Sequence, residues 1–214
     1  MNSYFTKTPK WIRAFYPNQV WSLPAKKKEI YLTFDDGPTP EITNWVLNTL
    51  HEYNAKATFF CIGENIEKEP STFNKIINQG HSIGNHTFNH EKGWKTVNED
   101  YLKSVVKTKK IIEKYPTSDN SESLFRPPYG KIKKSQTKLL IKNNYKIIMW
   151  SILSWDFDTT ITPEICLNNV IKNAKSGDII VFHDSVKAFK NLKVVLPKVL
   201  DYFSGKGYEF KEIK

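Results

Sequence analysis

Residues 30–38 read Ile-Tyr-Leu-Thr-Phe-Asp-Asp-Gly-Pro. The first five are apolar, aromatic or β-branched, which is typical of a strand buried on both faces of a parallel sheet. Two carboxylates follow the strand directly, at the place where a nucleotide-binding α/β protein carries a glycine-rich phosphate loop. The stretch therefore predicts an α/β fold whose first strand ends in acidic side chains and not in a phosphate site.

Strand and helix patterns alternate from residue 29 to the end of the chain. We expect strands at 30–34, 57–61, 81–85, 124–126, 146–150, 178–182 and 208–210. We expect helices at 41–52, 64–79 with a break at Pro70, 98–115, 135–143, 162–174 and 192–203, and a polar loop over 116–123. Strands that lead into helices predict a parallel sheet, either an open doubly wound sheet or a barrel.

The positive charge of the chain is concentrated at its start. The formal net charge is +10, and residues 1–28 hold six Lys and Arg with no Asp or Glu. We therefore divide the 214 residues into a basic aromatic N-terminal arm, 1–28, and one folded domain, 29–214, that carries the chemistry. We expect the arm to pack its aromatic side chains on the domain and leave its lysines in solvent. The alternative is that it lies on an anionic membrane surface through Trp11, Ile12, Phe15 and Trp21.

Composition excludes several classes of protein. No run approaches 18 apolar residues, so no transmembrane helix is expected. No secretory signal peptide is recognisable, which places the protein by default in the cytoplasm or at the inner membrane. No nucleic-acid-binding module accompanies the charge. Cys61 and Cys166 are interpreted as free core thiols, and His51 and His81 as structural residues.

Titratable side chains follow five of the expected strands. They are Asp35 and Asp36, then His86 and His90, Arg126, Asp156, and finally His183 and Asp184. The carboxyl ends of parallel strands meet at one edge, where α/β proteins place their active sites. The sequence therefore predicts that these residues share one site.

The histidine pair suggests a metal centre. His86 and His90 are four residues apart, and on one helical turn both imidazoles would face the same ion. Together with one carboxylate they would leave coordination positions open for water and substrate. Side chains of adjacent strand residues diverge, so one of Asp35 and Asp36 would bind the metal and the other would act as a base.

Two further segments suggest groups that assist a reaction. Residues 126–130 read Arg-Pro-Pro-Tyr-Gly, a stiff turn that could hold the amides of Tyr129 and Gly130 toward an oxyanion. Arg126 could pair with a carboxylate through two parallel hydrogen bonds. His183 ends an apolar strand, and with Asp156 it is a candidate for acid–base chemistry.

These motifs, in this order, resemble those of the polysaccharide deacetylase family, carbohydrate esterase family 4, also called the NodB-homology domain. The five matching segments are 33–38, 86–90, 126–130, 150–157 and 181–184. The resemblance implies a distorted, incomplete (β/α) barrel with about seven parallel strands, in which residues 29–214 form the catalytic domain.

The resemblance also implies a metal and a base. Asp36, His86 and His90 would bind a divalent metal, usually zinc, with cobalt, nickel or manganese as the other candidates. Asp35 would be the general base, and Arg126 would hold it in its ionised form.

The remaining roles follow the same resemblance. His183 would be the general acid, oriented by Asp156, and the amide of Tyr129 would bind the oxyanion. Phe157 and Val181 would line a pocket for the acetyl methyl group. The fourth motif departs from the family pattern, because Leu153 and Phe157 stand where the family commonly carries Asp and Trp.

The activity implied is metal-dependent removal of N-acetyl groups from a polysaccharide or oligosaccharide that contains N-acetylglucosamine, peptidoglycan-like or chitin-like. One alternative is an esterase that removes O-acetyl groups from a polysaccharide such as xylan. An alternative of another class is a non-catalytic carbohydrate- or membrane-binding module. The partner is an acetylated amino-sugar polymer, with peripheral contact to an anionic membrane or wall polymer through residues 1–28.

Overall fold

The computed structural model describes residues 5–24, 27–116 and 123–214. Residues 1–4 and 25–26 of the predicted arm, and residues 117–122 of the predicted polar loop, lie outside the described residues.

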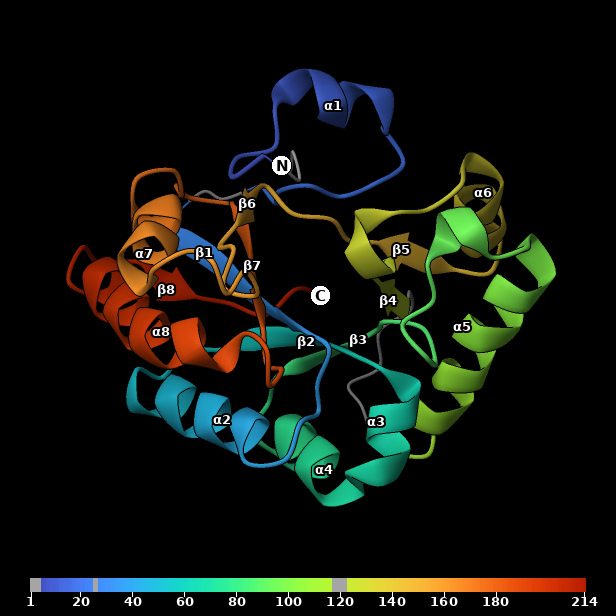
Figure 1. Cartoon of the computed structure of the whole chain (residues 1–214), viewed down its shortest axis with the longest axis horizontal. Coiled ribbons are helices and arrows are strands. Elements are labelled where there is room, and N and C mark those ends of the chain that lie inside the picture. The colour runs from blue at the N-terminus through green and yellow to red at the C-terminus, as the bar shows by residue number, and fades with distance from the viewer. Residues whose placement is uncertain (1–4, 25–26, 117–122) are drawn as a thin grey trace.

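The centre of the molecule is one parallel sheet (Figure 1). Its strands are β1 (Glu29–Asp35), β2 (Ala57–Cys61), β3 (Ser82–Asn85), β4 (Ser123–Phe125), β5 (Tyr145–Ile147), β6 (Ile152–Leu153), β7 (Ile179–His183) and β8 (Glu209–Phe210). The order is β5-β4-β3-β2-β1-β7-β6, and β8 pairs with β1. All pairs between these strands are parallel. The sheet curls without closing, which confirms the predicted incomplete barrel (Figure 1).

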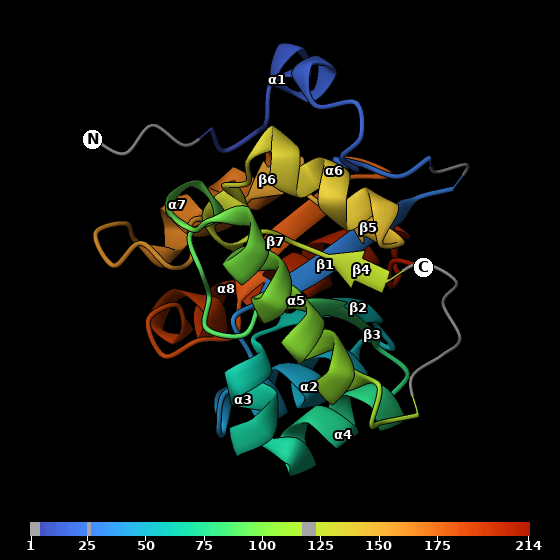
Figure 2. The same ribbon diagram turned by 90° about the vertical axis from the view of Figure 1, so that its right-hand side faces the viewer.

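Helices cover the outside of the curled sheet (Figures 1 and 2). They are α2 (Ile42–Glu52), α3 (Gly63–Lys68), α4 (Pro70–Asn78), α5 (Asn98–Ile112), α6 (Lys134–Lys142), α7 (Pro163–Ile171) and α8 (Phe189–Ser204). Two short 3-10 turns, η1 (Gly93–Lys95) and η2 (Pro128–Gly130), lie in loops after β3 and β4. The expected break before α4 occurs at Pro70, whose ring cannot continue the hydrogen bonding of α3.

Side-chain alternation along β1 and β7 separates the core from the site. Phe34 stacks on Phe59 and on Phe182, with ring centroids 5.1 and 6.1 Å apart, in the main cluster of buried apolar residues, to which α2 and α8 contribute. Because alternate residues of a strand point to opposite faces, Asp35 and His183 point away from this core, toward the inside of the barrel. The strand pattern thereby aims the titratable groups at one interior surface.

The expected strand at 146–150 is only partly correct. β5 ends at Ile147, and the chain then crosses to a short strand that was not predicted, β6. The guanidinium of Arg126 donates from Nε to the carbonyl of Ile148 at 3.2 Å and from Nη2 to that of Met149 at 2.9 Å. These carbonyls are therefore used by a side chain, and the strand does not extend to residue 150.

The N-terminal segment covers the opening between β5 and β6. Near β6, the amide of Thr8 donates to the carbonyl of Ser151 at 2.9 Å. At the end of β5, the amide of Val20 donates to the carbonyl of Ile147 at 2.8 Å. Figure 1 shows α1 (Lys10–Phe15) above this gap, between the two strand ends. The segment thus supplies backbone partners at both ends of the open sheet.

The expectation that the arm packs its aromatic residues on the domain is wrong for α1. Trp11 and Phe15 are 61% and 70% exposed, and α1 has no buried residue. Backbone hydrogen bonds on both sides of α1 hold the segment, so its side chains are not needed for anchoring. Trp21 does follow the expectation, since it packs against a cluster that includes Met149. The division into arm and catalytic domain stays a prediction.

Both cysteines, Cys61 and Cys166, are free and buried, as expected. His81 is buried as well, and its Nδ1 accepts a hydrogen bond from the amide of Ala57 at 3.2 Å, which fits a structural role. Within the described ranges, none of the helices combines the length and apolar character needed to cross a membrane.

Candidate active site

Strand register gathers the titratable residues at the carboxyl edge of the sheet. Asp35 is the register partner of His183 across the β1–β7 pair, and the amide of Asp184 donates to the carbonyl of Asp35 at 3.1 Å. On the other side, the amide of Arg126 donates to Asn85, the last residue of β3, at 3.0 Å. Four loops therefore begin at the same edge of the sheet, and the side chain of Arg126 reaches across β2 to Asp35.

Asp36, His86 and His90 form one cluster. Asp36 Oδ1 lies 3.3 Å from Nε2 of His90 and 3.8 Å from Nε2 of His86. One ligand atom from each residue lies within 4.8 Å of the other two, which is close enough to share a single cation. These are the three residues that the sequence predicts as metal ligands.

The histidines do not lie on a helical turn, which corrects the sequence interpretation. Thr87 and His90 have φ angles of 66° and 57°, in the left-handed region, so residues 86–90 form an irregular loop. The loop is held by Asn85 Oδ1, which accepts from the amide of Thr87 at 2.9 Å, and by the Thr87 hydroxyl, which accepts from the amide of Glu91 at 3.0 Å. The i, i+4 spacing brings the imidazoles together through these turns and not through helical periodicity.

The donor set of this cluster fits a divalent cation. Asp36 Oδ1 is buried and has no hydrogen-bond partner among the described residues. The Nδ1 of His86 donates to the carbonyl of Arg126 at 2.8 Å, which leaves Nε2 to face Asp36, the arrangement usual for a metal-binding histidine. Burial lowers the pKa of His86 to about 4 and also lowers that of His90, which favours in both the neutral form that a metal ligand needs.

Asp35 is held by a buried arginine. Nη1 of Arg126 donates to Oδ1 of Asp35 and to the hydroxyl of Thr33, each at 2.7 Å. Burial disfavours the charge of Asp35, but the charge and hydrogen bond of Arg126, together with the nearby imidazoles of His86 and His183, outweigh it, and the pKa of Asp35 lies below its ordinary value. The expected pairing through two parallel hydrogen bonds is wrong, because the other guanidinium nitrogens bind backbone carbonyls.

His183 is held by Asp156 at two points. Nδ1 of His183 lies 2.8 Å from Oδ1 of Asp156, and the amide of His183 donates to Oδ2 at 2.7 Å. Burial lowers the pKa of His183, but the charge and hydrogen bond of Asp156, with the charges of Asp36 and Asp35, outweigh it and raise this pKa to about 9. Asp156 is held in turn by two hydrogen bonds: the hydroxyl of Ser154 donates to its carboxylate, and the amide side chain of Asn191 donates to its backbone carbonyl. The imidazolium therefore has only Nε2 left to offer to the site.

One of the two predicted amides at 126–130 is used within the turn itself. The amide of Gly130 donates to the carbonyl of Pro127 at 2.9 Å, so it stabilises the turn, and its expected role toward an oxyanion is wrong. Tyr129 has a φ of 60°, and its ring lies 4.5 Å from that of His90. The turn therefore places Tyr129 directly beside the metal cluster.

The two residues expected to line an acetyl pocket lie next to His183. The ring of Phe157 is 5.0 Å from that of His183, in an edge-to-face arrangement. Val181 is buried on β7 and shares the face of His183, two residues along the strand. Leu153 pairs with Val181 in register, so the apolar departure in the fourth motif lies in the sheet beside Val181.

Several supporting residues were not assigned from the sequence. Asn65 of α3 donates to the carbonyl of Asp36 at 2.7 Å, and no local pattern marks it. Asp184 was recognised at the edge of the sheet but received no role. Thr33 and Ser154 lie inside the matching motifs, yet only their hydrogen bonds identify what they do.

Asp184 supports the loop that carries Asp35 and Asp36. Its Oδ1 accepts from the amide of Gly37 at 3.0 Å, and its Oδ2 accepts from the hydroxyl of Thr43 at 2.5 Å. A Cβ on Gly37 would lie 2.0 Å from the carboxylate, so only glycine fits above it. Burial, with the nearby charge of Asp36, raises the pKa of Asp184 to about 8.

Replacing this carboxylate tests its support of the loop. In Asp184→Ala, the Gly37 amide and the Thr43 hydroxyl lose their acceptor, at a cost of about 1–3 kcal/mol for each group left unsatisfied. Zinc affinity should fall by about 10–100-fold, the usual effect of losing an outer-shell contact. Denaturant unfolding and zinc titration measure the two effects. The milder Asp184→Asn serves if the alanine variant does not fold, and unchanged zinc affinity in a folded variant would contradict the role.

Comparison with known proteins gives a consistent family. A family model described as polysaccharide deacetylase matches residues 22–148, more than half of the chain. A peptidoglycan-N-acetylglucosamine deacetylase of Bacillus cereus is 37% identical over 194 residues, covering 89% of this chain and 88% of the relative. A chitooligosaccharide deacetylase of Azorhizobium caulinodans is 31% identical over 166 residues, covering 78% of each.

A solved structure gives the same result. The crystal structure of the Bc1960 peptidoglycan N-acetylglucosamine deacetylase, in complex with 4-naphthalen-1-yl-N-oxidanyl-benzamide, superimposes with a TM-score of 0.86. It is 33% identical in sequence, and the match covers 96% of this chain and 95% of the other. From the family match, these relatives and the shared fold, this chain belongs to the polysaccharide deacetylase family, carbohydrate esterase family 4.

Proposed function

We propose that this protein is a metal-dependent hydrolase that removes N-acetyl groups from a polymer or oligomer containing N-acetylglucosamine, peptidoglycan-like or chitin-like. The observation that carries the proposal is the register pair Asp35 and His183, one hydrogen-bonded to a buried arginine and the other to a buried carboxylate, beside the Asp36–His86–His90 cluster. The activities named for the two relatives above support the substrate class.

Asp36, His86 and His90 would hold the divalent cation, and their two nitrogens and one carboxylate suit zinc, with cobalt, nickel and manganese as the other candidates. When bound, such an ion supplies Lewis acidity that polarises an acetyl carbonyl and acidifies a water. Everything else in the reaction falls to the side chains of the protein.

Asp35 acts as the base. Its carboxylate accepts the proton of the attacking water while the water oxygen forms a bond to the acetyl carbon. Arg126 keeps the carboxylate ionised and prevents it from turning toward the neighbouring ligands. Because Oδ1 is bound to the guanidinium, Oδ2 is the atom that takes the proton.

His183 acts as the acid. As the bond between the acetyl carbon and nitrogen breaks, its Nε2 donates a proton to the departing nitrogen, which leaves as an amine, and acetate is the other product. Asp156 keeps the ring charged and fixes its orientation. An amine leaves poorly unless it is protonated, so this acid is more important for an amide than for an ester.

Three groups would complete the site. The amide of Tyr129 would bind the developing oxyanion, and Phe157 with Val181 would enclose the acetyl methyl group. This geometry serves an O-acetyl group on a polysaccharide such as xylan as well, so an esterase is the second candidate among enzymes. A non-catalytic carbohydrate- or membrane-binding module is the alternative of another class.

Acetate release separates these functions. The zinc-loaded protein should release acetate from oligomers of N-acetylglucosamine faster than from acetylated xylan. Asp35→Asn should keep its zinc and lose about 10²–10⁴-fold in rate, the usual contribution of a general base. His86→Ala should lose zinc in elemental analysis. Sugar binding without any acetate release would instead identify a non-catalytic module, and faster release from xylan would identify an esterase.

The pairing of His183 with Asp156 predicts the alkaline limit of activity. The pKa of His183 is raised from 6.5 to about 9, so the acid is protonated below this pH and is lost as pH rises through it. Rate against pH should therefore fall on the alkaline side at a value above 6.5 in the wild type. In Asp156→Asn the counter-charge is gone, and the limb should move toward lower pH. If the alkaline limb of the pH profile did not move, the titration behind it would belong to a group other than His183.

The exposed aromatic pair of α1 supports a peripheral contact through residues 1–28. Trp11 and Phe15 meet edge to face, with centroids 6.3 Å apart, and Lys10 and Arg13 lie on the same helix. Exposed aromatic residues among cations suit the interface of an anionic membrane, and a wall polymer with the same charge is the other candidate surface.

Sedimentation with vesicles tests this contact. Wild-type protein should sediment with phosphatidylglycerol vesicles, and Trp11→Ala/Phe15→Ala should bind about tenfold or more weakly, because each ring contributes about 1.5–3 kcal/mol when buried. Ile165→Ala, an exposed apolar residue on α7, is the matched control. Equal sedimentation of all three proteins would remove the proposal, and binding to purified wall polymer alone would assign the second surface.

A further inference from the structure

Two loops run side by side away from the metal cluster. Residues 90–98 follow β3, and residues 129–135 follow β4. The rings of His90 and Tyr129 are 4.5 Å apart, and further along the indole nitrogen of Trp94 donates to the carbonyl of Ile132 at 3.1 Å. At the far end, Lys133 Nζ donates to the carbonyl of Thr96 at 2.8 Å. We call this pair of segments the double loop.

The side chain of Gln136 joins the two segments of the double loop. This residue is buried, and its Nε2 donates to the carbonyls of Gly93 and Thr96 at 2.9 and 3.1 Å. Its Oε1 accepts from the amide of Lys133 at 2.9 Å. Gly93 approaches so closely that a Cβ there would lie 2.6 Å from the carbonyl oxygen of Lys131. These contacts hold the backbones of the two segments together, which lowers the cost of ordering that a ligand would meet.

Two large rings face solvent on this surface, and a lysine lies against each, Lys92 exposed and Lys131 half-buried. Tyr129 is 41% exposed and Trp94 is 59% exposed. Lys92 Nζ lies 5.1 Å from the centre of the Tyr129 ring, and Lys131 Nζ lies 5.4 Å from that of Trp94. Trp94 follows His90 by four residues, so their Cα atoms are at most about 14 Å apart. Each exposed ring thus has a lysine beside it, within reach of a chain bound at the metal cluster.

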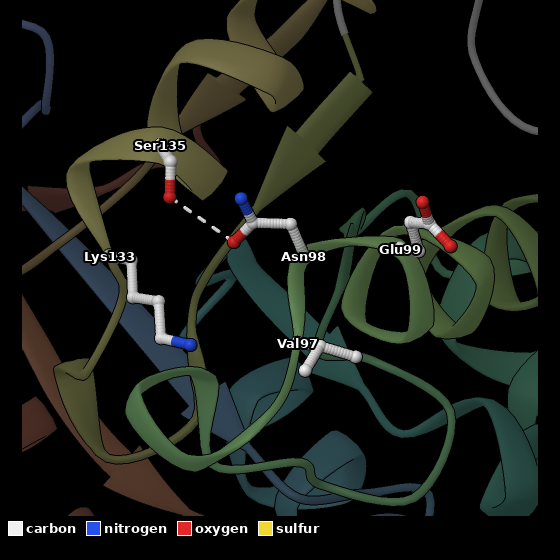
Figure 3. Close-up of a pocket in the computed structure, with 5 residues that line it drawn as sticks. All are labelled: Val97, Asn98, Glu99, Lys133 and Ser135. Carbon is white, nitrogen blue, oxygen red and sulfur yellow. Dashed lines mark hydrogen bonds between the residues drawn. The ribbon is translucent and has the colours of Figure 1, made fainter.

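The double loop ends in a surface pocket of about 530 Å³ (Figure 3). Its lining residues, Val97, Asn98, Glu99, Lys133 and Ser135, come from both segments and from the first turns of α5 and α6. Ser135 Oγ donates to Asn98 Oδ1 at 3.1 Å across it (Figure 3). The double loop thus runs from His90 and Tyr129, whose rings are in contact, through Trp94 to the residues that line this pocket.

We propose that the double loop is the binding track for the sugars that flank the acetylated residue, and that it selects an amino-sugar chain carrying carboxylate groups over a neutral one. The inference rests on the proposed function and narrows its substrate class. Trp94 provides an apolar face on which a sugar ring stacks, and Lys92 and Lys131 bind a carboxylate attached to the chain.

Charge on the neighbouring elements agrees with this choice. Glu91, the acid nearest to Lys92 in the sequence, is engaged with the loop itself, since its carboxylate accepts from the amide of Asn89 at 3.2 Å. Glu99 lies at the far pocket, beyond Trp94. The charged side chains that lie against the rings of Tyr129 and Trp94 are Lys92 and Lys131, and an anionic substituent is the chemistry that they complement.

Binding to the non-hydrolysing Asp35→Asn protein tests the track apart from turnover. Calorimetry compares neutral N-acetylglucosamine oligomers with peptidoglycan glycan fragments of equal length that carry carboxylates. Trp94→Ala should weaken binding of both ligands about tenfold, as expected for loss of an aromatic anchor. Ile141→Ala, an exposed apolar residue at the other end of α6, is the matched control and should change neither.

The lysines are tested by Lys92→Gln/Lys131→Gln, with Lys110→Gln/Lys138→Gln as the control of equal charge. The first pair should weaken binding of the carboxylated fragments about three- to tenfold, leave neutral oligomers unchanged, and remove the extra salt sensitivity of the carboxylated ligand. Equal affinity of both ligands for the wild-type surface, or no effect of Trp94→Ala, would overturn the inference.

Failure of the proposed function has a different result. A wild-type protein that binds the fragments through Trp94 and the two lysines, yet releases no acetate when loaded with zinc, would retain the track and reject the hydrolase. Acetate release that none of these track substitutions changes would instead retain the hydrolase and reject the track.

Discussion

The hydrogen bonds of the buried Arg126 connect almost every part of the site. Its guanidinium binds Asp35, the hydroxyl of Thr33 and the carbonyls of residues 148 and 149, and it lies 4.1 Å from the centre of the Phe60 ring. Its own carbonyl accepts from His86. A fully buried cation is tolerable only when its donors are satisfied and a counter-charge is close. The carboxylate of the base is that counter-charge, and the crossing between β5 and β6 supplies the acceptors.

Three aspartates at this edge of the sheet differ only in their surroundings. Asp35 is paired with an arginine that favours its ionised form. Asp36 faces two imidazoles and has an oxygen to which none of the described residues donates, and Asp184 accepts from an amide and a hydroxyl. The same chemical group thus becomes a base, a candidate metal ligand and a structural acceptor. Buried networks of this kind are tightly specified, because a partner lost from one of them leaves a polar group unsatisfied.

The sequence interpretation succeeded where the pattern is local and failed where partners come from far away. Strands, helices and the break at Pro70 agree with the structure within a few residues, because apolar alternation and proline act on their own segment. The strand expected at 146–150 is shorter, since Arg126 takes its carbonyls from a distance of more than twenty residues. The histidine spacing pointed to the correct pair of residues through an incorrect local geometry, because i, i+4 contacts also arise across an irregular loop.

By itself, the sequence determined the alternation of strands and helices, the parallel sheet, and the set of titratable residues that follow the strands. These depend on side-chain periodicity and on the rule that parallel strands end at one edge. Only the tertiary structure decided which nitrogen of each histidine faces the site, which partner sets each pKa, how the N-terminal segment covers the open barrel and which exposed rings lie beside the metal cluster. The reason is physical: hydrogen bonds, burial and charge depend on neighbours in space, and the neighbours of Asp35, His86 and His183 are tens of residues away along the chain.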